Sequence, residues 1–449
     1  MRGGEAFQAA AGRGEPETAE VAGLTREGEG IVRGGKTAFV AGALPGETVS
    51  FQRTRRHRQH DEGRLLQVLR PAPQRVIPRC AHFGVCGGCA LQHLAPEAQL
   101  ALKEQELRDN LARVARVECE SWLPPLRGPV WGYRRRARLG AKYVPKKGKV
   151  VVGFRERLAP YVADVTRCEV LAPPVGALIQ PLSDLLGTLD IRQHVPQIEA
   201  AVADNATALV LRVLRTPSEQ DLAKLRDFAA RHSVRFYLQS GGLDSIEALT
   251  ADEPAGAGLW YALSGFDLTL DFKPTDFVQV NGAVNGALVR RAVELLHPTS
   301  ESRVLDLYCG LGNFTLALAR SAGSVTGVEG EAGLVERARH NARRNGLANV
   351  EFHTGNLASA AQLGSAWLSG PYSHVLLDPP RVGAVPEMLA AIAGLAAQRV
   401  LYVSCHPGSL ARDLGILVHE HGFTLESAGV IDMFPHTAHV ESMALLRRP

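Results

Sequence analysis

The sequence lacks any apolar run long enough to span a lipid bilayer, which argues against a membrane-spanning protein. Its first residues, MRGGEAFQAAAGRGEPE, also lack the continuous apolar segment of a secretory signal. We therefore expect a soluble protein that stays in the cytoplasm and has no membrane partner.

Cysteine is scarce: the chain has seven, an odd number, in 449 residues. A long intracellular chain of this kind does not rely on disulfide bonds, so its cysteines point to metal, redox or nucleophilic roles. The net charge is also small, at +4, but the positive charge is uneven. It gathers at RTRRHR (53–58) and RRRARLGAKYVPKKGK (134–149), which indicates an acidic partner.

The length predicts two or three domains. Between about Val21 and Pro71, apolar residues alternate and Gly or Pro turns recur, which predicts a small antiparallel β-barrel over 15–72. This stretch resembles the TRAM barrels, of OB-like form, that bind RNA. The alternative is a structural β module whose arginines form a solvated loop.

The remaining chain divides into two further regions. Residues 73–272 mix strand-like runs such as ALVLRVLR with helical stretches such as SEQDLAKLRDFAARH, which predicts an α+β domain. Over 273–449, apolar strands alternate with helices, which predicts a doubly wound, Rossmann-like parallel sheet. We thus expect a multidomain α/β protein whose ligands bind at the carboxyl ends of the parallel strands.

The segment VLDLYCGLGNFTLALA passes from a buried strand through a glycine turn into a helix. Gly310 and Gly312 let the backbone approach a ligand, and Glu329 at the end of the next strand can accept hydrogen bonds from ribose hydroxyls. Asp306 lies before the turn, and Thr315 occupies the third glycine position of the dinucleotide motif. This pattern resembles S-adenosylmethionine-dependent methyltransferases more than enzymes that use NAD.

Two further residues extend this interpretation. Asp378 in LLDPPR ends a strand before a stiff loop, where its carboxylate can contact a planar base or the cofactor. The alternative for Asp378 is a turn former or a helix N-cap. Cys405 in YVSCHPG ends a later strand. A thiolate beside a methyl donor can add to C6 of a pyrimidine and make C5 nucleophilic, which requires a thiol of low pKa.

Such a reaction also needs a base to remove the C5 proton. Glu441, at the start of the last apolar run, is our choice, with His436 and His439 nearby. The alternative for Glu441 is an ordinary charge at a strand edge.

Several motifs together identify a family. FVQVN, LDLYCGLGNFTLALA, LLDPPR, YVSCHPGSLARDL and FPHTAHVESMALL resemble the RNA 5-methyluridine methyltransferases, and the resemblance covers nearly the whole chain. It implies a class I methyltransferase domain over 273–449, Cys405 as nucleophile and Glu441 as base. It also implies an S-adenosylmethionine site formed by Gln279, Tyr308, Asn313, Glu329, Asn356 and Asp378. Pro380 and His406 replace the Ala and Asn common in relatives.

A cysteine turn suggests a metal centre. Cys80, Cys86 and Cys89 are clustered, and Cys168 follows at a distance. Four thiolates suit either zinc or a [4Fe-4S] cluster, and three grouped cysteines with one distant favour the cluster. Cys119 and Cys309 are expected to be core or incidental residues.

The resemblance also indicates the substrate. The CxxxxxCGGC turn and the barrel resemble those of the iron–sulfur branch of the family, which methylates a uracil of 23S ribosomal RNA. From the same resemblance, the transfer-RNA branch is expected to lack both features. We expect a monomer that acts at the U1939-type site, with both basic clusters contacting RNA. The alternatives are another 23S uracil, a transfer-RNA uracil, or a ribosome-assembly factor without catalysis.

Overall fold

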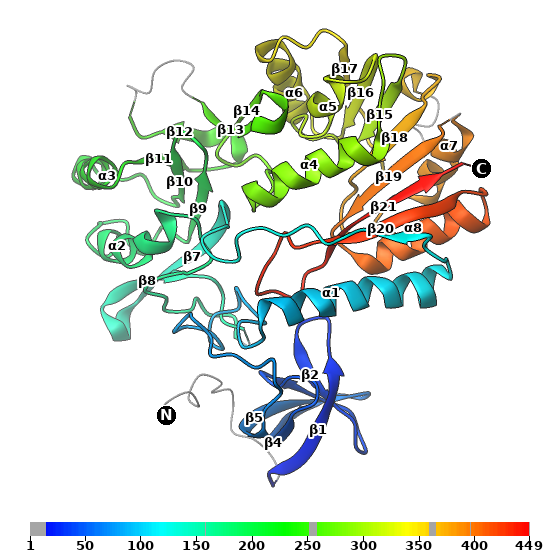
Figure 1. The fold of residues 1–449 in the computed structure, drawn as a ribbon. Helices are drawn as coiled ribbons and strands as arrows, with labels where there is room; N and C mark the ends of the chain where they lie inside the picture. The colour runs from blue at the N-terminus through cyan, green and yellow to red at the C-terminus, as the bar shows by residue number, and fades with distance from the viewer. Residues whose placement is uncertain (1–14, 158, 251–257, 359–364, 396, 449) are drawn as a thin grey trace.

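The computed structural model describes residues 15–448 apart from residue 158, residues 251–257, residues 359–364 and residue 396. Figure 1 shows three parts: a barrel at the bottom, a sheet with two helices on the left, and a larger sheet flanked by helices on the right. Within the described residues, no helix has the length and apolar character needed to cross a bilayer.

The N-terminal part is a closed five-stranded barrel in the order β1-β2-β3-β5-β4. Alternate residues such as Val40, Val49 and Phe51 point inward and are fully buried. The barrel was predicted, but the pairing is not wholly antiparallel, because β3 runs parallel to β5. The strands are β1 (Glu17–Leu24), β2 (Glu29–Val32), β3 (Ala38–Ala41), β4 (Thr48–Arg56) and β5 (Asp61–Arg70).

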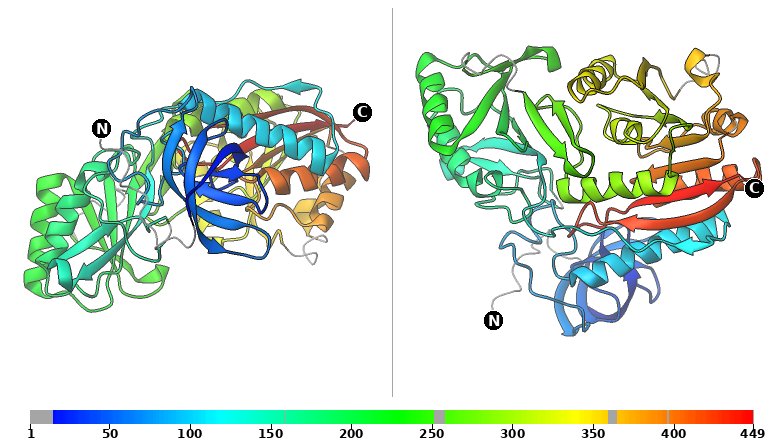
Figure 2. Two further views of the ribbon diagram at one scale, coloured as in Figure 1. Left: turned by 90° about the horizontal axis from the view of Figure 1, so that it is seen from below. Right: turned by 45° about the horizontal axis from the view of Figure 1, so that its top comes forward.

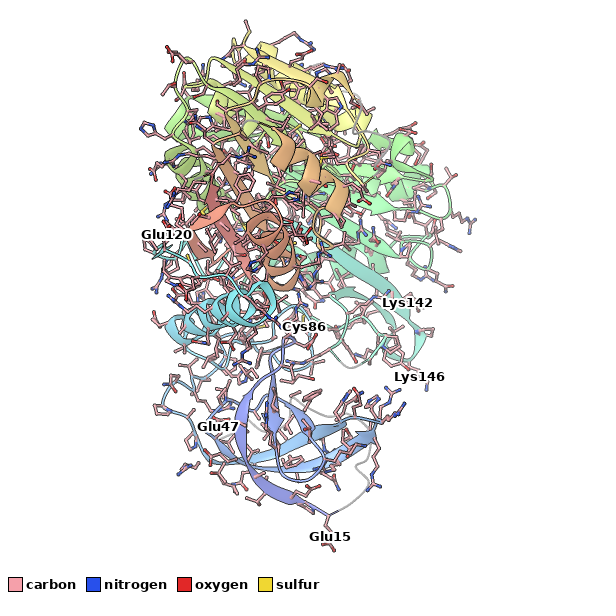
Figure 3. All side chains as sticks on the ribbon, turned by 90° about the vertical axis from the view of Figure 1, so that its right-hand side faces the viewer. Glu15, Glu47, Cys86, Glu120, Lys142 and Lys146 are labelled. Atoms are coloured by element: carbon pink, nitrogen blue, oxygen red, sulfur yellow. The ribbon has the colours of Figure 1, made fainter. Side chains whose placement is uncertain are left out.

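A buried carboxylate ties the barrel to the chain that follows it. Glu47 accepts hydrogen bonds from the backbone N–H groups of Leu44 and Ala72, at 2.9 and 3.1 Å. Its Oε1 also lies 2.5 Å from Nε of Arg75, which donates a further bond to the carbonyl of Gly42. Figure 3 shows Glu47 on the barrel and Cys86 where the barrel meets the rest of the molecule.

The central sheet has the order β12-β11-β10-β9-β7-β8. Leu182 and Phe228, from the two helices of this part, lie in one core with Leu209 and Phe236 of the sheet, which matches the predicted α+β character. The elements are β7 (Arg136–Val144), β8 (Lys149–Gly153), α2 (Val175–Gly187), β9 (Gln197–Val202), β10 (Thr207–Arg212), α3 (Glu219–His232), β11 (Val234–Gln239) and β12 (Ile246–Ala248).

The C-terminal sheet has the order β17-β16-β15-β18-β19-β21-β20-β6 among the described residues. The strands are β15 (Arg303–Leu307), β16 (Ser324–Glu329), β17 (Val350–Thr354), β18 (His374–Leu377), β19 (Arg399–Ser404), β20 (Thr424–Ile431) and β21 (Glu441–Arg447). The helices are α4 (Gly282–Leu296), α5 (Thr315–Ala319), α6 (Ala332–Arg344), α7 (Pro386–Gly394) and α8 (Pro407–His419). A wholly parallel sheet was the expectation, and this is wrong for β21, which is antiparallel to both neighbours.

Two segments from the range 73–272 pack against this C-terminal sheet. Helix α1 (Pro96–Asn110) and the π-helical turn Leu111–Ala115 share a core with α8 and β20, and β6 (Ser121–Trp122) pairs with β20. The hairpin of β13 (Leu259–Leu263) and β14 (Leu268–Phe272) shares the core of α4 and α6. Figure 2 shows α1 alongside the C-terminal sheet. The boundary at 272/273 stays a prediction.

Lys103 holds α1 to the connection between β20 and β21. Its side chain is buried, and Nζ donates to Asp432 Oδ1 at 2.7 Å and to the carbonyl of Phe434 at 2.9 Å. Replacing Lys103 with Met leaves the Asp432 carboxylate without its cation. We expect Lys103→Met to lower the free energy of unfolding by about 3–5 kcal/mol, measured by chemical denaturation.

The exposed Lys142 provides the control for this prediction. Lys142→Met should change the free energy of unfolding by less than about 0.5 kcal/mol. Equal stability of the two variants would contradict the role given to Lys103.

Candidate active site

The predicted site residues gather at one edge of the C-terminal sheet. Strands β16, β15, β18 and β19 run parallel in register, so their carboxyl ends meet at the same edge. Glu329 is the last residue of β16, while Tyr308, Asp378 and Cys405 come directly after β15, β18 and β19. The prediction that ligand-binding groups lie at strand ends therefore agrees with the topology.

The antiparallel β21 brings Glu441 to this same edge. Ser404, the last residue of β19, pairs with Ser442 of β21. One step further, the same register places Cys405 opposite Glu441. A strand that begins at the edge where its neighbours end can do this only if it is antiparallel. The nucleophile and base expected from the sequence are thus neighbours across two strands.

The Cys405 thiol does not have the low pKa that was predicted for a nucleophile at this position. Burial, together with the negative charges of Glu441 and Asp378, raises its pKa to about 11, while Arg381 opposes the shift. The side chain is half-buried. At this pKa the thiol form of Cys405 predominates at neutral pH, so a reaction through its thiolate needs a proton acceptor.

Glu441 and Asp378 form a pair of carboxyl groups with raised pKa values. Burial is the main cause for both groups, and repulsion from Asp378 adds to the shift for Glu441, whose side chain is buried. A carboxyl group whose pKa is raised toward neutrality is well matched to proton transfer. This supports Glu441 as a base rather than an ordinary strand-edge charge.

The glycine turn after β15 is held by Glu329. Gly310 donates its backbone N–H to Glu329 Oε2 at 3.1 Å. Gly310 and Gly312 have φ values of +56° and +97°, and Tyr308 also has a positive φ, +65°. A non-glycine residue in this region costs free energy, and such residues cluster at ligand sites. The turn is therefore fixed in a conformation that exposes its backbone at the sheet edge.

Asp306 and Thr315 close the base of this turn. The Thr315 hydroxyl donates to Asp306 Oδ2 at 2.5 Å, and both side chains are buried. Burial raises the pKa of Asp306 to about 7. The threonine at the third motif position thus donates a hydrogen bond to the carboxylate beneath the turn. Gly or Ala at this position could not donate that bond.

The other predicted cofactor residues lie around this turn. Asn313 exchanges two hydrogen bonds with Asn285, at 2.9 and 3.0 Å, and accepts a third from the Tyr261 hydroxyl at 3.0 Å. Gln279 lines a small cavity with Tyr261 and Asn285. Asn356 is exposed. Sequence reasoning missed Tyr261 and Asn285, because only folding brings β13 and α4 to the glycine turn.

His436 is a structural residue. Its ring stacks on Trp131 with centroids 3.9 Å apart, and its backbone carbonyl accepts from Ala90 and Leu91. Gln99 Oε1 accepts from the His436 backbone N–H at 2.8 Å. These contacts link the 434–440 connection to α1 and the cysteine turn.

Four cysteines line one small, largely apolar cavity: Cys80, Cys86, Cys89 and Cys168. All seven cysteines are free of disulfide bonds. Burial raises the pKa of Cys86 to about 11 and that of Cys89 to about 12, and the neighbouring sulfurs add to both shifts. Such buried, mutually repelling thiols suit a site whose positive charge comes from bound metal.

In the part of the chain that the structure describes, no three His, Cys, Asp or Glu side chains are arranged to hold a single metal ion. Four thiolates are a donor set that suits either zinc or an iron–sulfur cluster.

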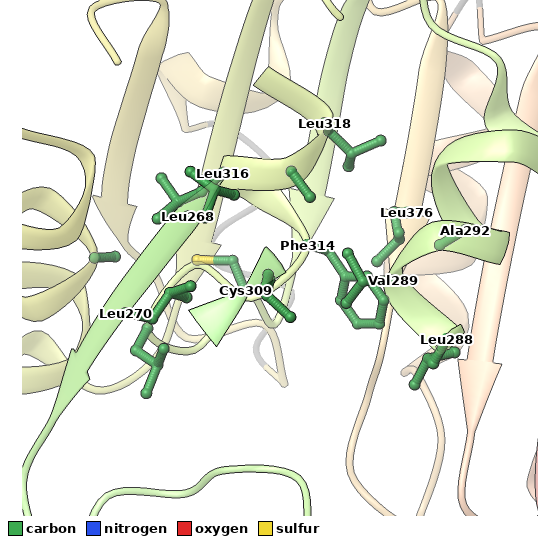
Figure 4. Packing of buried hydrophobic residues seen from close by; sticks show 14 of the residues in the cluster. Leu268, Leu270, Leu288, Val289, Ala292, Cys309, Phe314, Leu316, Leu318 and Leu376 are labelled. Atoms are coloured by element: carbon green, nitrogen blue, oxygen red, sulfur yellow. The ribbon is translucent and has the colours of Figure 1, made fainter. Parts of the chain in front are cut away.

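The two remaining cysteines have ordinary surroundings. Cys309 is buried against Leu268, Leu270 and Leu316, as Figure 4 shows. Cys119 is half-buried, and its thiol donates to the carbonyl of Ser121. Both match the expectation of core or incidental residues.

Much of the two basic clusters is paired with carboxylates. Arg53 contacts Glu17 and Asp61 at 2.8 and 2.9 Å. Lys147 and Lys149 both contact Asp164, at 2.8 and 2.7 Å. These cations are partly neutralised, so the two clusters offer less free positive charge to an acidic partner than their sequence pattern indicates.

A cleft of about 1080 Å³ opens between the three parts of the molecule. Its walls come from the β1–β2 turn, the cysteine turn, the central sheet and the 437–439 segment next to Glu441. Cys405 and Glu441 do not line the cleft, but Arg381, which lines it, acts electrostatically on Cys405, and His439, which also lines it, lies two residues before Glu441. Six arginines line it: Arg26, Arg134, Arg138, Arg155, Arg157 and Arg381.

Comparison with known proteins decides the family. Residues 262–449 match the family model described as tRNA (Uracil-5-)-methyltransferase. The chain is 48% identical over 435 residues to the 23S rRNA (uracil(1939)-C(5))-methyltransferase RlmD of Methylococcus capsulatus, and 50% identical over 435 residues to that of Alkalilimnicola ehrlichii. Both alignments cover 97% of this chain and 97% of the relative. The chain belongs to the RNA uracil-C5 methyltransferase family.

The family fold extends to transfer-RNA enzymes. The tRNA (uracil-54, C5)-methyltransferase of Pyrococcus abyssi, solved with S-adenosyl-L-homocysteine, superposes with a TM-score of 0.73 at 23% identity. It covers 96% of this chain and 100% of its own. The expectation that transfer-RNA enzymes lack the barrel is therefore wrong for this relative, and architecture alone does not separate the two substrates.

The raised thiol pKa makes a direct prediction. Below a pKa of about 11 the thiolate fraction grows tenfold per pH unit, so alkylation of Cys405 by iodoacetamide should keep accelerating up to pH 10. Glu441→Gln removes one negative neighbour, which favours the thiolate and should lower this pKa. The measurement is the rate of carbamidomethylation of the Cys405 peptide by mass spectrometry.

Glu420→Gln, at the other end of α8, serves as the matched control and should follow the unsubstituted protein. A rate that levels off near pH 8.5 would contradict the raised pKa.

Proposed function

We propose that this protein methylates C5 of a uracil in 23S ribosomal RNA, at the position equivalent to uracil 1939, with S-adenosylmethionine as methyl donor. The observation that supports the chemistry is the antiparallel register of β19 and β21, which pairs Ser404 with Ser442 and so brings the next residues, Cys405 and Glu441, to the same sheet edge. The substrate assignment is supported by relatives at 48% and 50% identity over 97% of the chain, whose names give this activity.

The chain supplies the nucleophile and the base of this reaction. Cys405 loses its proton to solvent, its sulfur bonds to C6 of the uracil, and the electrons of the C5=C6 bond make C5 nucleophilic. S-adenosylmethionine, when bound, would supply the methyl group that C5 takes, and breaking of its sulfur–methyl bond would leave S-adenosylhomocysteine. Glu441 then removes the C5 proton, and the bond between sulfur and C6 breaks, which restores the C5=C6 bond and frees the thiolate.

The methyl donor fits the edge formed by β15, β16 and β18. The fixed glycine turn offers backbone to a ligand, and Glu329 lies beside it as a ribose acceptor. Asn313 is held in place by Asn285 and Tyr261. We assign cofactor binding to Gln279, Tyr308, Asn313, Glu329, Asn356 and Asp378.

Cys80, Cys86, Cys89 and Cys168 would hold a [4Fe-4S] cluster, and no redox step is needed for methylation. The cluster would stabilise the loops that form one wall of the cleft. Since three parts of a single chain wall this cleft, we propose that the protein acts as a monomer. We also propose a cytoplasmic location, which is where a ribosomal RNA substrate would be found. A transfer-RNA uracil is the second candidate, supported by the shared architecture of the Pyrococcus abyssi enzyme.

The decisive experiment is methyl transfer from labelled S-adenosylmethionine to unmodified 23S RNA, with 5-methyluridine mapped by mass spectrometry. The full-length protein should mark one uracil, and Cys405→Ala should mark none. Glu441→Gln should form the methylated adduct but release it about 10²- to 10⁴-fold more slowly, because the C5 proton stays in place. A covalent protein–RNA band on a denaturing gel measures this adduct.

Glu420→Gln should turn over normally in the same assay. Methylation by Cys405→Ala, or label on cytosine, would overturn the thiolate mechanism. Label on transfer RNA alone would replace the substrate.

The cluster assignment is tested by metal analysis. Protein purified without oxygen should contain about four irons per chain if each of the four cysteines binds one iron. Replacing Cys80, Cys86, Cys89 or Cys168 with serine should lower the iron content, whereas Cys119→Ser should leave it unchanged. Bound zinc in place of iron would contradict the assignment.

A further inference from the structure

The β1–β2 turn of the barrel, residues 24–29, forms part of the cleft wall beside the reaction centre. Figure 1 shows this hairpin rising from the barrel toward α1. Arg26 and Glu27 at its tip line the cleft together with Arg381 and His439. Burial is the main cause that lowers the pKa of His406, the residue next to Cys405, and of His439 below their ordinary values, and the positive charge of Arg26 contributes to both shifts.

The turn has a fixed shape. Thr25 Oγ1 accepts from the backbone N–H groups of Glu27 and Glu29, at 3.2 and 3.1 Å. Gly28 has a φ of +77°, and a Cβ at this position would lie only 3.0 Å from the Leu91 side chain. The turn is thus packed closely against the cysteine turn, which leaves room for glycine alone.

Arg157 pins the turn from the central domain. Its side chain is 10% exposed, Nη2 donates to the carbonyl of Glu27, and the guanidinium lies 3.9 Å from Glu29. The backbone of Arg157 is in turn held by the cysteine turn, because its N–H donates to the carbonyl of Val85 at 2.9 Å.

Two arginine side chains at the cleft have hydrogen-bond donors without an acceptor among the described residues. Arg157 Nη1 is buried at the cleft, and within the described residues it has no hydrogen-bond partner. Arg26 is exposed, and the described part of the chain offers it no ion pair or side-chain hydrogen bond. A buried guanidinium nitrogen without an acceptor costs free energy, and an anion entering the cleft would satisfy it.

The wider charge pattern agrees with an anionic occupant. Of the six arginines in the cleft, Arg138 contacts Glu199 and Arg157 lies near Glu29. In the regions that the structure describes, Arg26, Arg134, Arg155 and Arg381 form no ion pair. The cleft therefore keeps free positive charge, part of which comes from Arg134 of the 134–149 cluster.

We propose that Arg26 and Arg157 form a phosphate-binding subsite, which holds the RNA backbone next to the target uridine. The barrel is then part of the active-site wall rather than a separate RNA-binding appendage. Arg26 supplies an exposed cation, and Arg157 supplies a buried donor and also fixes the turn that carries Arg26. This inference rests on the proposed function, because it places the reacting nucleotide beside Cys405.

The test compares Arg26→Ala with Arg33→Ala, an exposed barrel arginine that does not line the cleft. The probe is a fluorescent RNA transcript spanning the uracil at position 1939, and its dissociation constant is measured by anisotropy at several salt concentrations. We expect Arg26→Ala to weaken binding about tenfold or more and to lower the salt slope by about 1. Affinity for S-adenosylmethionine, measured by calorimetry, should stay unchanged.

Arg157→Met and the double variant complete the design. If both residues act on one phosphate, the double variant loses less affinity than the product of the single losses. Fully multiplicative losses would overturn the shared subsite. Arg26→Ala that binds RNA as tightly as Arg33→Ala would overturn the role of Arg26, and this variant carries the test even if Arg157→Met fails to fold.

Binding is measured without turnover, which separates the two proposals. If the unsubstituted protein binds the transcript but methylates nothing, the proposed function fails while the comparison between Arg26→Ala and Arg33→Ala still decides the subsite.

Discussion

The antiparallel insertion of β21 between β19 and β20 is the constraint on which the catalytic arrangement depends. A thiol and a carboxyl from distant parts of the sequence meet because one strand ends where the other begins. The pairing fixes which residues face each other, since a slip of one residue would turn Glu441 to the opposite face of the sheet. Lys103 and Gln99 of α1 reinforce the register by holding the chain between β20 and β21.

This arrangement gives the Cys405 thiol a pKa well above neutrality. Burial and two nearby carboxyl groups keep Cys405 protonated, although the reaction needs its thiolate. The same burial raises the pKa of Glu441 and so suits it to accept a proton. An enzyme with a protonated resting thiol is protected from stray alkylation and oxidation, because both reactions proceed through the thiolate.

The sequence predicted the parts of this structure that depend on local pattern. Alternating apolar residues and glycine turns indicated the barrel, and strand ends indicated Glu329, Asp378 and Cys405. The role of Glu441 needed the family resemblance, because strand direction is not readable from residues 441–447 alone. The neutralisation of Arg53 by Glu17 and of Lys149 by Asp164 was not predictable either, since each pair forms only after distant strands come together. The same holds for Arg26, whose sequence neighbours carry no sign of the cleft.

The position of β21 also bears on how the enzyme is made. During synthesis, a nascent chain that has reached residue 431 holds β19 and β20 but not the strand that joins them. Both strands then have an unpaired edge, and unpaired edges promote aggregation. Strand β21, which pairs with both edges, also carries Glu441. A chain interrupted before it would lack both the completed sheet and Glu441.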